Sequence, residues 1–366
     1  TPGVAISDNV LEIKENNFLG CVHIDRNNVG IAFLDISTGE FLVGEGSADY
    51  ADRILATFKP KEVLYEKGKR QAFMELFGTK WLTYPFDDWA FEPSSARQRL
   101  VKQFETQSLK GFGVEGIALG TTAAGAIMHY LDITEHDRLK HINKLTRIEG
   151  DNYVWLDRFT VRNLELFPSG IDGTTSLFDI MDKTHTPMGA RMLRRWMSLP
   201  QKDRNIIENR LDSVWSLGTD EDANSSYRDQ LDEILASIGD LERLAGKAST
   251  MRITPREMLQ LKRTLFSVTP IRQMLLNSSA KHMRDLAASL SECIEMRERI
   301  EHEISPEAPT TIAKGGAIAN GVNEELDMLR HISSSSKDYL NEMQERLINE
   351  TGITSLKVGF NNVFGY

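Results

Sequence analysis

Residues 151–217 read DNYVWLDRFTVRNLELFPSGIDGTTSLFDIMDKTHTPMGARMLRRWMSLPQKDRNIIENRLDSVWSL. Within this stretch, Thr186-Pro187 predicts the start of a helix, because threonine can cap a first turn and proline fits the first helical position. Pro200 ends that helix. The helix has one apolar face at 3–4 residue spacing, formed by Met188, Met192, Leu193 and Trp196.

A second helix follows directly. Asp203 is its predicted cap and Gly218 its predicted stop. Its apolar stripe consists of Ile207, Leu211 and Val214. The two helices predict a helix–turn–helix corner inside an all-α body.

The first 150 residues have a different pattern. From Phe18 to Val43, apolar and β-branched residues alternate with polar ones, and Asn27-Asn28 and Thr38-Gly39 supply turn chemistry, so we expect three antiparallel strands. A further strand is predicted at Lys61–Glu66. Helices are predicted at Ala51–Phe58, Lys69–Phe77 and Thr121–Leu131. This part is therefore a small α/β domain.

From about Gly150 onward the patterns are helical. Thr254 and Glu257 form a capping box with proline between them. Further helices are predicted at Met283–Glu303 and from Asn323 to Thr351-Gly352. The last one has an apolar seam with serines at its centre, which predicts a coiled-coil-like arm that loosens or breaks at Ser333–Ser336.

Several motifs together resemble the MutS family of DNA mismatch repair proteins. The family's "LD..TxRNLEL" and "SLF..LD.T.TPMGxRxLRxW" segments lie in residues 151–217, and its "DISTGEF" stands at Asp35–Phe41. Gly111–Gly116 resembles another family segment, and Gly315–Arg330 and Thr351–Tyr366 match two more. The resemblance thus covers essentially the whole chain.

The resemblance implies a multi-domain fold. We expect an N-terminal α/β connector domain with a ribonuclease-H-like fold at 9–148, followed by the first part of an all-α core or lever domain at 149–318. A long helical arm ending in a small β clamp would occupy 319–366, incomplete at its C-terminus. The TPG start and the half-built C-terminal hairpin indicate an excised fragment.

Composition constrains the compartment and the ligand. The two cysteines, Cys21 and Cys293, have no metal-ligand spacing, and no apolar run reaches the length of a membrane span, so a cytoplasmic protein is expected. The net charge of −10 predicts weak DNA binding by this chain alone, since such binding depends on lysine and arginine contacts to phosphate.

Few residues have the pattern of a catalytic site. Leu241–Ser249 contains Gly246-Lys247 but lacks the glycine and the Ser or Thr of a phosphate loop, so a helical surface is predicted there. Asp25 and Asp35 could hold Mg²⁺ for a nuclease, although turn-capping, solvent-facing carboxylates are the favoured interpretation. The histidines form no recognisable ligand set, and we expect no hydrolase chemistry.

The densest basic group is Arg191, Arg194, Arg195 and Lys202. Phosphate contact is one interpretation. The favoured one is structural: the group lines the outer face of a core helix and pairs with Asp179, Asp182 or Asp203.

Lys357, Asn361 and Asn362 are the predicted DNA-backbone site. Leu356, Val358 and Phe360 alternate as the apolar face of a strand, so the lysine and the Asn-Asn turn project elsewhere. One cation and two amides suit phosphate contacts. In the family the clamp tip grips the DNA backbone, and Lys357 and Asn361 match its motif directly, whereas Asn362 sits at a variable position. An ordinary surface hairpin is the alternative.

The function implied by the resemblance is recognition of mismatched double-stranded DNA by an ATP-dependent clamp. This chain would supply connector, lever and clamp, and would itself be no enzyme and hold no cofactor. ATP, Mg²⁺, a homodimeric state and a MutL-type partner belong to the full-length parent. The alternatives are a metal-dependent nuclease on the ribonuclease-H-like domain and a MutS paralogue that acts on recombination intermediates.

Overall fold

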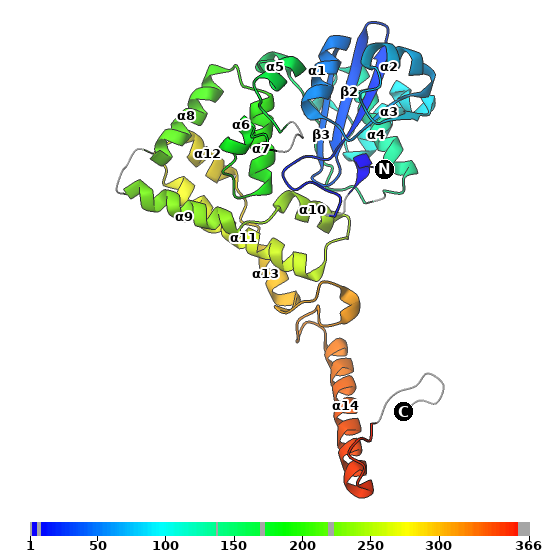
Figure 1. The fold of residues 1–366 in the computed structure, drawn as a ribbon, viewed down its shortest axis with the longest axis vertical. Coiled ribbons are helices and arrows are strands. Elements are labelled where there is room, and N and C mark those ends of the chain that lie inside the picture. The colour runs from blue at the N-terminus through cyan, green and yellow to red at the C-terminus, as the bar shows by residue number, and fades with distance from the viewer. Residues whose placement is uncertain (1, 6–8, 137, 169–172, 219–222, 358–366) are drawn as a thin grey trace.

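A computed structural model describes residues 2–5, 9–136, 138–168, 173–218 and 223–357. Figure 1 shows an α/β region, a group of helices beside it, and one long helix that points away from both. The predicted order of a mixed α/β region followed by a largely helical region is confirmed. Within the described residues, no helix is both long enough and apolar enough to cross a membrane.

The α/β region is built on one sheet with strand order β5-β4-β1-β2-β3-β6. The strands are β1 (Phe18–Asp25), β2 (Asn28–Asp35), β3 (Glu40–Ser47), β4 (Glu62–Glu66), β5 (Thr83–Phe86) and β6 (Thr146–Arg147). β1, β2 and β3 form the predicted antiparallel meander, whereas β4 pairs parallel to β1, β5 to β4, and β6 to β3.

Helices cover both faces of this sheet. One apolar core joins the sheet to α1 (Ala48–Phe58) and α2 (Arg70–Phe77). The other joins it to α3 (Pro93–Gln103) and α4 (Ala118–Ile133). α4 lies so close that a Cβ on Gly120 would meet the carbonyl oxygen of Gly44 at 2.6 Å. Both faces of the central strands are therefore buried, as the run of buried residues in β2 shows.

The helical region begins with α5 (Arg158–Asn163), α6 (Leu177–Met181), α7 (Pro187–Ser198), α8 (Arg204–Gly218) and α9 (Ala223–Ser237). It continues with α10 (Leu241–Ser249), α11 (Pro255–Leu276), α12 (Lys281–Ser289), α13 (Ile294–Glu303) and α14 (Glu324–Thr351). The predicted caps are confirmed: the Thr186 side chain accepts from the Gly189 amide, and Thr254 and Glu257 form a reciprocal capping box. The Asp203 carboxylate accepts from the Ile206 amide.

Two predictions about helix continuity were wrong. Met283–Glu303 is not one helix, because α12 ends at Ser289 and Cys293 adopts a left-handed φ of 45° before α13. α14 runs unbroken through Ser333–Ser336, where a break was predicted. Serine costs only about 0.5 kcal/mol in a helix interior, and four serines therefore do not interrupt 28 residues of otherwise favourable helix.

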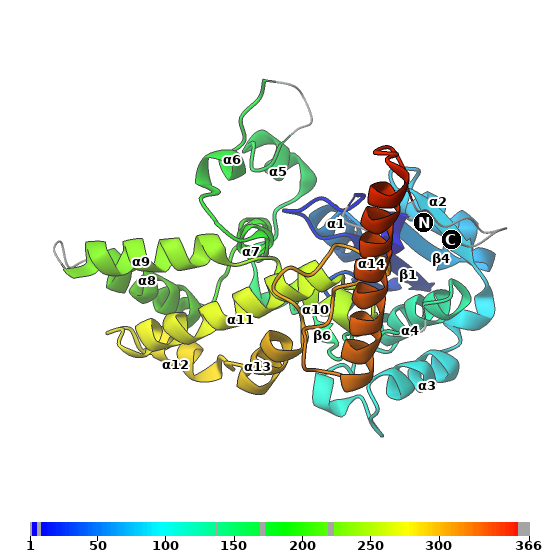
Figure 2. The ribbon, with the colours of Figure 1, turned by 90° about the horizontal axis from the view of Figure 1, so that it is seen from below.

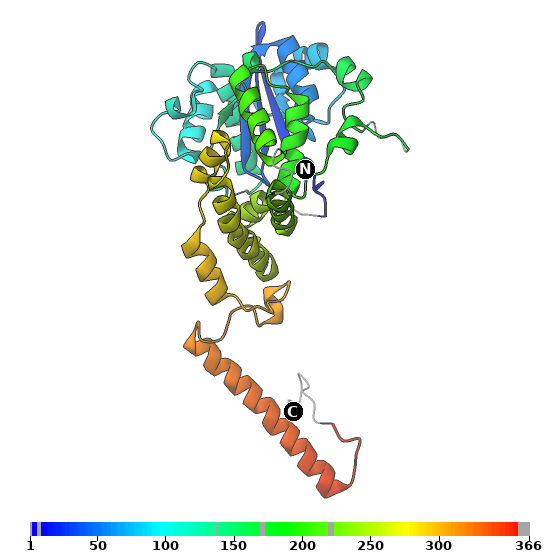
Figure 3. The same ribbon diagram turned by 90° about the vertical axis from the view of Figure 1, so that its left-hand side faces the viewer.

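α14 stands apart from the rest of the chain (Figure 3). Its base is tied to the preceding loop, because Arg330 Nη2 donates to Ile318 O at 2.8 Å and Ile318 pairs with Ile304 after α13. Figure 2 views the molecule from below and shows α14 in front of the rest of the chain.

Candidate functional site

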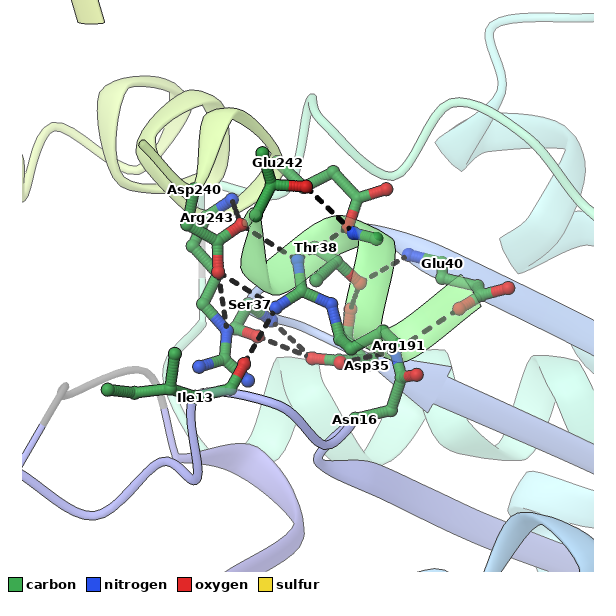
Figure 4. A network of polar contacts seen from close by, with 12 residues as sticks. Ile13, Asn16, Asp35, Ser37, Thr38, Glu40, Arg191, Asp240, Glu242 and Arg243 are labelled. Carbon is green, nitrogen blue, oxygen red and sulfur yellow. Dashed lines mark hydrogen bonds and ion pairs between the residues drawn. The ribbon is translucent and has the colours of Figure 1, made fainter. Parts of the chain in front are cut away.

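A buried polar network joins the α/β region to the first helices of the helical region (Figure 4). Its centre is Arg191 on α7, which is 4% exposed. Its guanidinium donates to both carboxylate oxygens of Asp240 at 2.8 and 2.7 Å, to Glu242 at 2.7 Å and to Ile13 O at 3.1 Å. Burial opposes the charged form, but the hydrogen bonds and charges of Asp240 and Glu242 outweigh it and raise the pKa of Arg191.

Arg243 on α10 extends the network into the N-terminal segment. Its Nη2 donates to Glu12 O at 2.9 Å and to Glu15 O at 2.8 Å. Asp240 caps α10 by accepting from the Arg243 amide. Two buried arginines, Arg191 and Arg243, therefore hold the segment before β1 against α7 and α10, and each satisfies carbonyl groups that would otherwise be left without donors.

Asp35, at the end of β2, shapes the turn on the other side of the network. The side chain is fully buried, so its predicted solvent-facing position was wrong. Its carboxylate accepts from Ser37 Oγ at 2.6 Å, the Ser37 amide at 3.0 Å, the Asn17 amide at 3.1 Å and Asn16 Nδ2 at 3.0 Å. The predicted turn-capping role is confirmed by the bonds to Ser37.

At the turn formed by residues 36–39, the two regions approach each other closely. A Cβ on Gly246 of α10 would meet Ser37 O at 2.4 Å, so only glycine permits this approach. His141 Nε2 contacts Ile36 O at 2.7 Å, and burial lowers the pKa of His141. Gly246-Lys247 is helical as predicted, but it packs against this turn and is not a surface.

The other arginines of α7 also face the α/β region. Arg195 forms an ion pair with Glu40 at the start of β3. Arg194 Nη2 lies 3.1 Å from Glu15 Oε1, and its guanidinium carbon lies over the Phe167 and Phe178 rings at 5.0 and 4.5 Å.

The structural role predicted for this basic group agrees with these contacts, but the predicted partners were wrong. Asp182 pairs with Lys14, Asp203 caps α8, and Asp179 completes the cap of α6 with Ser176. The arginines instead contact distant residues, as Arg191 does at Ile13, 178 positions away, and sequence spacing does not indicate such partners.

The nuclease alternative fails on strand register. Asp25 pairs with Asn28 at one end of the β1–β2 hairpin, whereas Asp35 pairs with Phe18 at the other end. Seven strand residues separate the two levels, or roughly 23 Å at 3.3 Å per residue. A two-metal site needs its ions about 4 Å apart. Within the described part of the chain, no group of three or more potential ligands could hold a metal ion.

A second group has the composition of a hydrolytic triad. Ser95 Oγ lies 3.2 Å from His129 Nε2, and His129 Nδ1 lies 4.0 Å from Asp132 Oδ2. The Asp132 carboxylate, however, is held by two bonds from Arg99, and the Ser95 amide donates to Glu92 and so cannot stabilise an oxyanion. These contacts therefore stabilise the packing of α3 against α4.

The predicted DNA site is described only at its first residue. Lys357 is exposed and follows a turn at 354–355, and residues 352–357 contain no strand, so the start of the predicted strand at Leu356 was wrong. Asn361 and Asn362 lie outside the described residues.

Family models match the two regions separately. MutS domain II matches residues 17–143, and MutS domain III matches residues 159–356. The second match alone covers more than half of the chain. This chain belongs to the MutS family.

Named MutS relatives match over the whole chain. The DNA mismatch repair proteins MutS of Phocaeicola vulgatus and Bacteroides thetaiotaomicron are each 50% identical over 366 residues. The MutS protein of Porphyromonas gingivalis is 45% identical over the same span. This chain covers 42%, 42% and 41% of those relatives, so it spans about two fifths of their length.

The polar network, which the sequence did not predict, lies at the boundary between the two matched domains. The network of Arg191, Asp240 and Arg243 joins the part matched by MutS domain II, with its preceding segment, to the part matched by MutS domain III. Of these three residues, the sequence singled out Arg191, through the cluster of arginines on α7. The acidic and carbonyl partners carry no local signature, because they come from segments distant along the chain.

Proposed function

We propose that this chain is the connecting and DNA-gripping part of a mismatch repair protein that acts as an ATP-dependent clamp on mismatched double-stranded DNA. The observation that carries the proposal is α14, a 28-residue helix whose base is tied to the segment after α13, while α13 packs on α11 and α11 packs on α10 of the buried polar network. A helix of that length extends about 42 Å at 1.5 Å per residue. A small rotation at its base therefore produces a large displacement at Lys357.

The junction, by which we mean the contacts of Arg191, Arg195 and Arg243 between the two regions, also supports a lever role. Arg191 and Arg243 link α7 and α10 to the segment before β1, and Arg195 links α7 to the start of β3. A rigid connection of this kind transmits rotation, as rigid-body allosteric transitions require. The chain would thus pass the state of DNA at the arm to elements elsewhere in the protein.

The remaining activities are assigned to the longer protein. ATP and Mg²⁺ would bind outside this chain, which would then hold no cofactor and catalyse no reaction of its own. Homodimer formation and contact with a MutL-type partner would likewise belong to the complete protein. The names of the relatives support mismatch repair over a paralogue that acts on recombination intermediates. A Phe-x-Glu motif encoded upstream of Thr1 would distinguish these two.

Lys357, Asn361 and Asn362 are proposed to contact phosphates at the end of the arm. The test uses the protein extended to the full length of its relatives, with Lys357→Ala and Asn361→Ala. Both variants should weaken binding about equally for matched and mismatched duplexes, because phosphate contacts carry no base information. Lys357→Ala should also reduce the log–log salt slope by roughly one.

The matched control for this test is Arg346→Ala. Arg346 lies on α14, before the segment that carries Lys357, and its side chain is 71% exposed and 3.8 Å from Glu350, so its removal should leave DNA affinity unchanged. A loss of mismatch preference in Lys357→Ala, with overall affinity retained, would contradict the proposed grip on the backbone.

A further inference from the structure

Residues 138–147 form the most basic short segment outside α7. They read RLKHINKLTR and contain Arg138, Lys140, Lys144 and Arg147 with no aspartate or glutamate. The chain as a whole has a net charge of −10, so four positive charges in ten residues are a strong local departure. We call these four cations the basic strip.

The basic strip faces solvent because of how the segment packs. Leu139, Ile142 and Leu145 are 5%, 0% and 1% exposed and belong to the core beneath α4. The four cations between and beside them are all exposed. None of the four forms an ion pair with any residue in the described ranges. The strip therefore presents unneutralised charge, unlike the arginines of the junction.

The backbone that carries the strip is fixed. Gln103 Nε2 on α3 donates to Leu139 O at 2.8 Å and to Ile142 O at 3.0 Å. β6 then pairs with the edge of β3, and the Ile148 amide donates to Val43 O at 2.8 Å. Because the segment is already ordered, a ligand would need to immobilise only the side-chain ends, which lowers the entropic cost of binding.

The strip also lies beside the junction. His141, in its middle, contacts Ile36 O, and a Cβ on Gly246 of α10 would lie 3.7 Å from its ring. From Arg138 to Arg147 the chain spans at most about 30 Å, since a residue extends no more than about 3.3 Å. Duplex DNA presents one negative charge per about 1.7 Å of its axis, so a single groove edge offers phosphates along the whole strip.

We propose that the basic strip binds the phosphate backbone of duplex DNA, as a second contact surface in addition to the end of the arm. The proposal rests on the proposed function only for the choice of DNA as the ligand; the shared chemistry is phosphate, which free nucleotides and polyphosphate also carry. Binding here is independent of sequence, because backbone contacts position a duplex without specifying bases. It would place DNA against the turn through which the two regions are joined.

The test measures binding of this chain to a fluorescent matched duplex by anisotropy, from about 50 to 200 mM salt. The double variant Lys140→Glu with Lys144→Glu should weaken binding at least about tenfold at the low salt and reduce the log–log slope by roughly two. Lys140→Gln with Lys144→Gln should give the same slope change. Circular dichroism and thermal melting check that both variants keep the fold.

The matched control is Arg53→Glu with Arg70→Glu. These arginines are exposed on α1 and α2, the helices that cover the opposite face of the sheet, and the control changes the net charge by the same amount. Duplex affinity should change less than about twofold, since surface charges beyond a Debye length of about 10 Å are screened. An equal loss in the control would overturn the proposal, because net charge alone would then explain it.

Other outcomes separate the strip from the arm. If Lys357→Ala weakens duplex binding and the strip variants do not, the strip proposal is wrong and the proposed function stands. If only the strip variants weaken it, the strip is supported and Lys357 makes no phosphate contact in this chain by itself. Saturable binding of ATP or inorganic polyphosphate that is lost in the strip variants, with no measurable duplex binding, would make the strip a site for small phosphates and would overturn its assignment to DNA.

Discussion

Arg191→Met should be the most informative single change in the junction. The substitution keeps the apolar stem that packs in α7 but removes four hydrogen bonds, to Asp240 twice, to Glu242 and to Ile13 O. Because Asp240 is only 16% exposed, its carboxylate would lose its main counter-ion in a partly desolvated position. Such a loss typically costs about 3–5 kcal/mol.

The lower end of that range applies here. Arg243 Nε lies 3.7 Å from Asp240 Oδ2 and still opposes part of the stranded charge. We therefore expect Arg191→Met to lower the free energy of unfolding by about 3 kcal/mol. Adding Asp240→Asn should recover part of this loss, because asparagine removes the unpaired charge yet still caps α10.

Urea unfolding monitored by circular dichroism gives the total effect, and hydrogen exchange locates it. Protection should fall first in residues 9–17 and in α10, which Arg191 holds together. Arg204→Met is the control: Arg204 is 88% exposed and pairs with Glu208 one turn along α8, so its loss should cost less than about 0.5 kcal/mol. The reasoning is refuted if Arg191→Met costs no more than Arg204→Met, or if Asp240→Asn makes it worse.

Two further predictions concern the same regions. Burial and the nearby Lys69 lower the pKa of His23 from 6.5 to about 4, so the folded state binds fewer protons and stability should fall as the pH drops from about 6.5 to 4. His23→Asn should remove up to about 3 kcal/mol of this pH dependence, measured by urea unfolding at each pH, and an unchanged profile would contradict the assignment. Gly246→Ala should destabilise by about 1–3 kcal/mol, although alanine ordinarily favours a helix, because its Cβ would meet Ser37 O at 2.4 Å. Gly116→Ala is the control, because nothing lies within 4 Å of the added Cβ. A rise in melting temperature for Gly246→Ala would contradict the prediction, since it would mean that the turn at Ser37 moves to accommodate the Cβ.

The metal and hydrolase questions illustrate why residue types alone did not settle the chemistry. Asp25 and Asp35 lie on neighbouring strands, as a nuclease would need, yet antiparallel pairing places them at opposite ends of the hairpin. Ser95, His129 and Asp132 come together, as a hydrolase would need, yet the Ser95 amide and the Asp132 carboxylate are already engaged elsewhere. The aspartates are excluded as a metal site by their separation, and the Ser95 group is excluded as a hydrolase site by the hydrogen bonds that its atoms already form.

The sequence by itself determined most local structure. The cap at Thr186-Pro187, the capping box at Thr254 and the turns after β1 and β2 depend on residues within about four positions of each other. The caps and the turn at Thr38-Gly39 form as predicted, and the turn after β1 lies one residue earlier than predicted, at Arg26-Asn27. Fold class followed from the same local signals, because alternation and helical spacing are properties of short windows. The family motifs were likewise contiguous and could be recognised without a structure.

Only the tertiary structure decided the partners and the exposure of charges. Arg191 was predicted to pair with aspartates near it in sequence, but it binds Asp240 and the carbonyl of Ile13. The basic strip was missed because its four cations are separated by apolar residues and stand out only when those residues are seen to be buried. Arg191 and Asp240 are 49 positions apart, and Arg195 and Glu40 are 155 positions apart. No local pattern encodes which distant carboxylate will face a given cation, or whether any will.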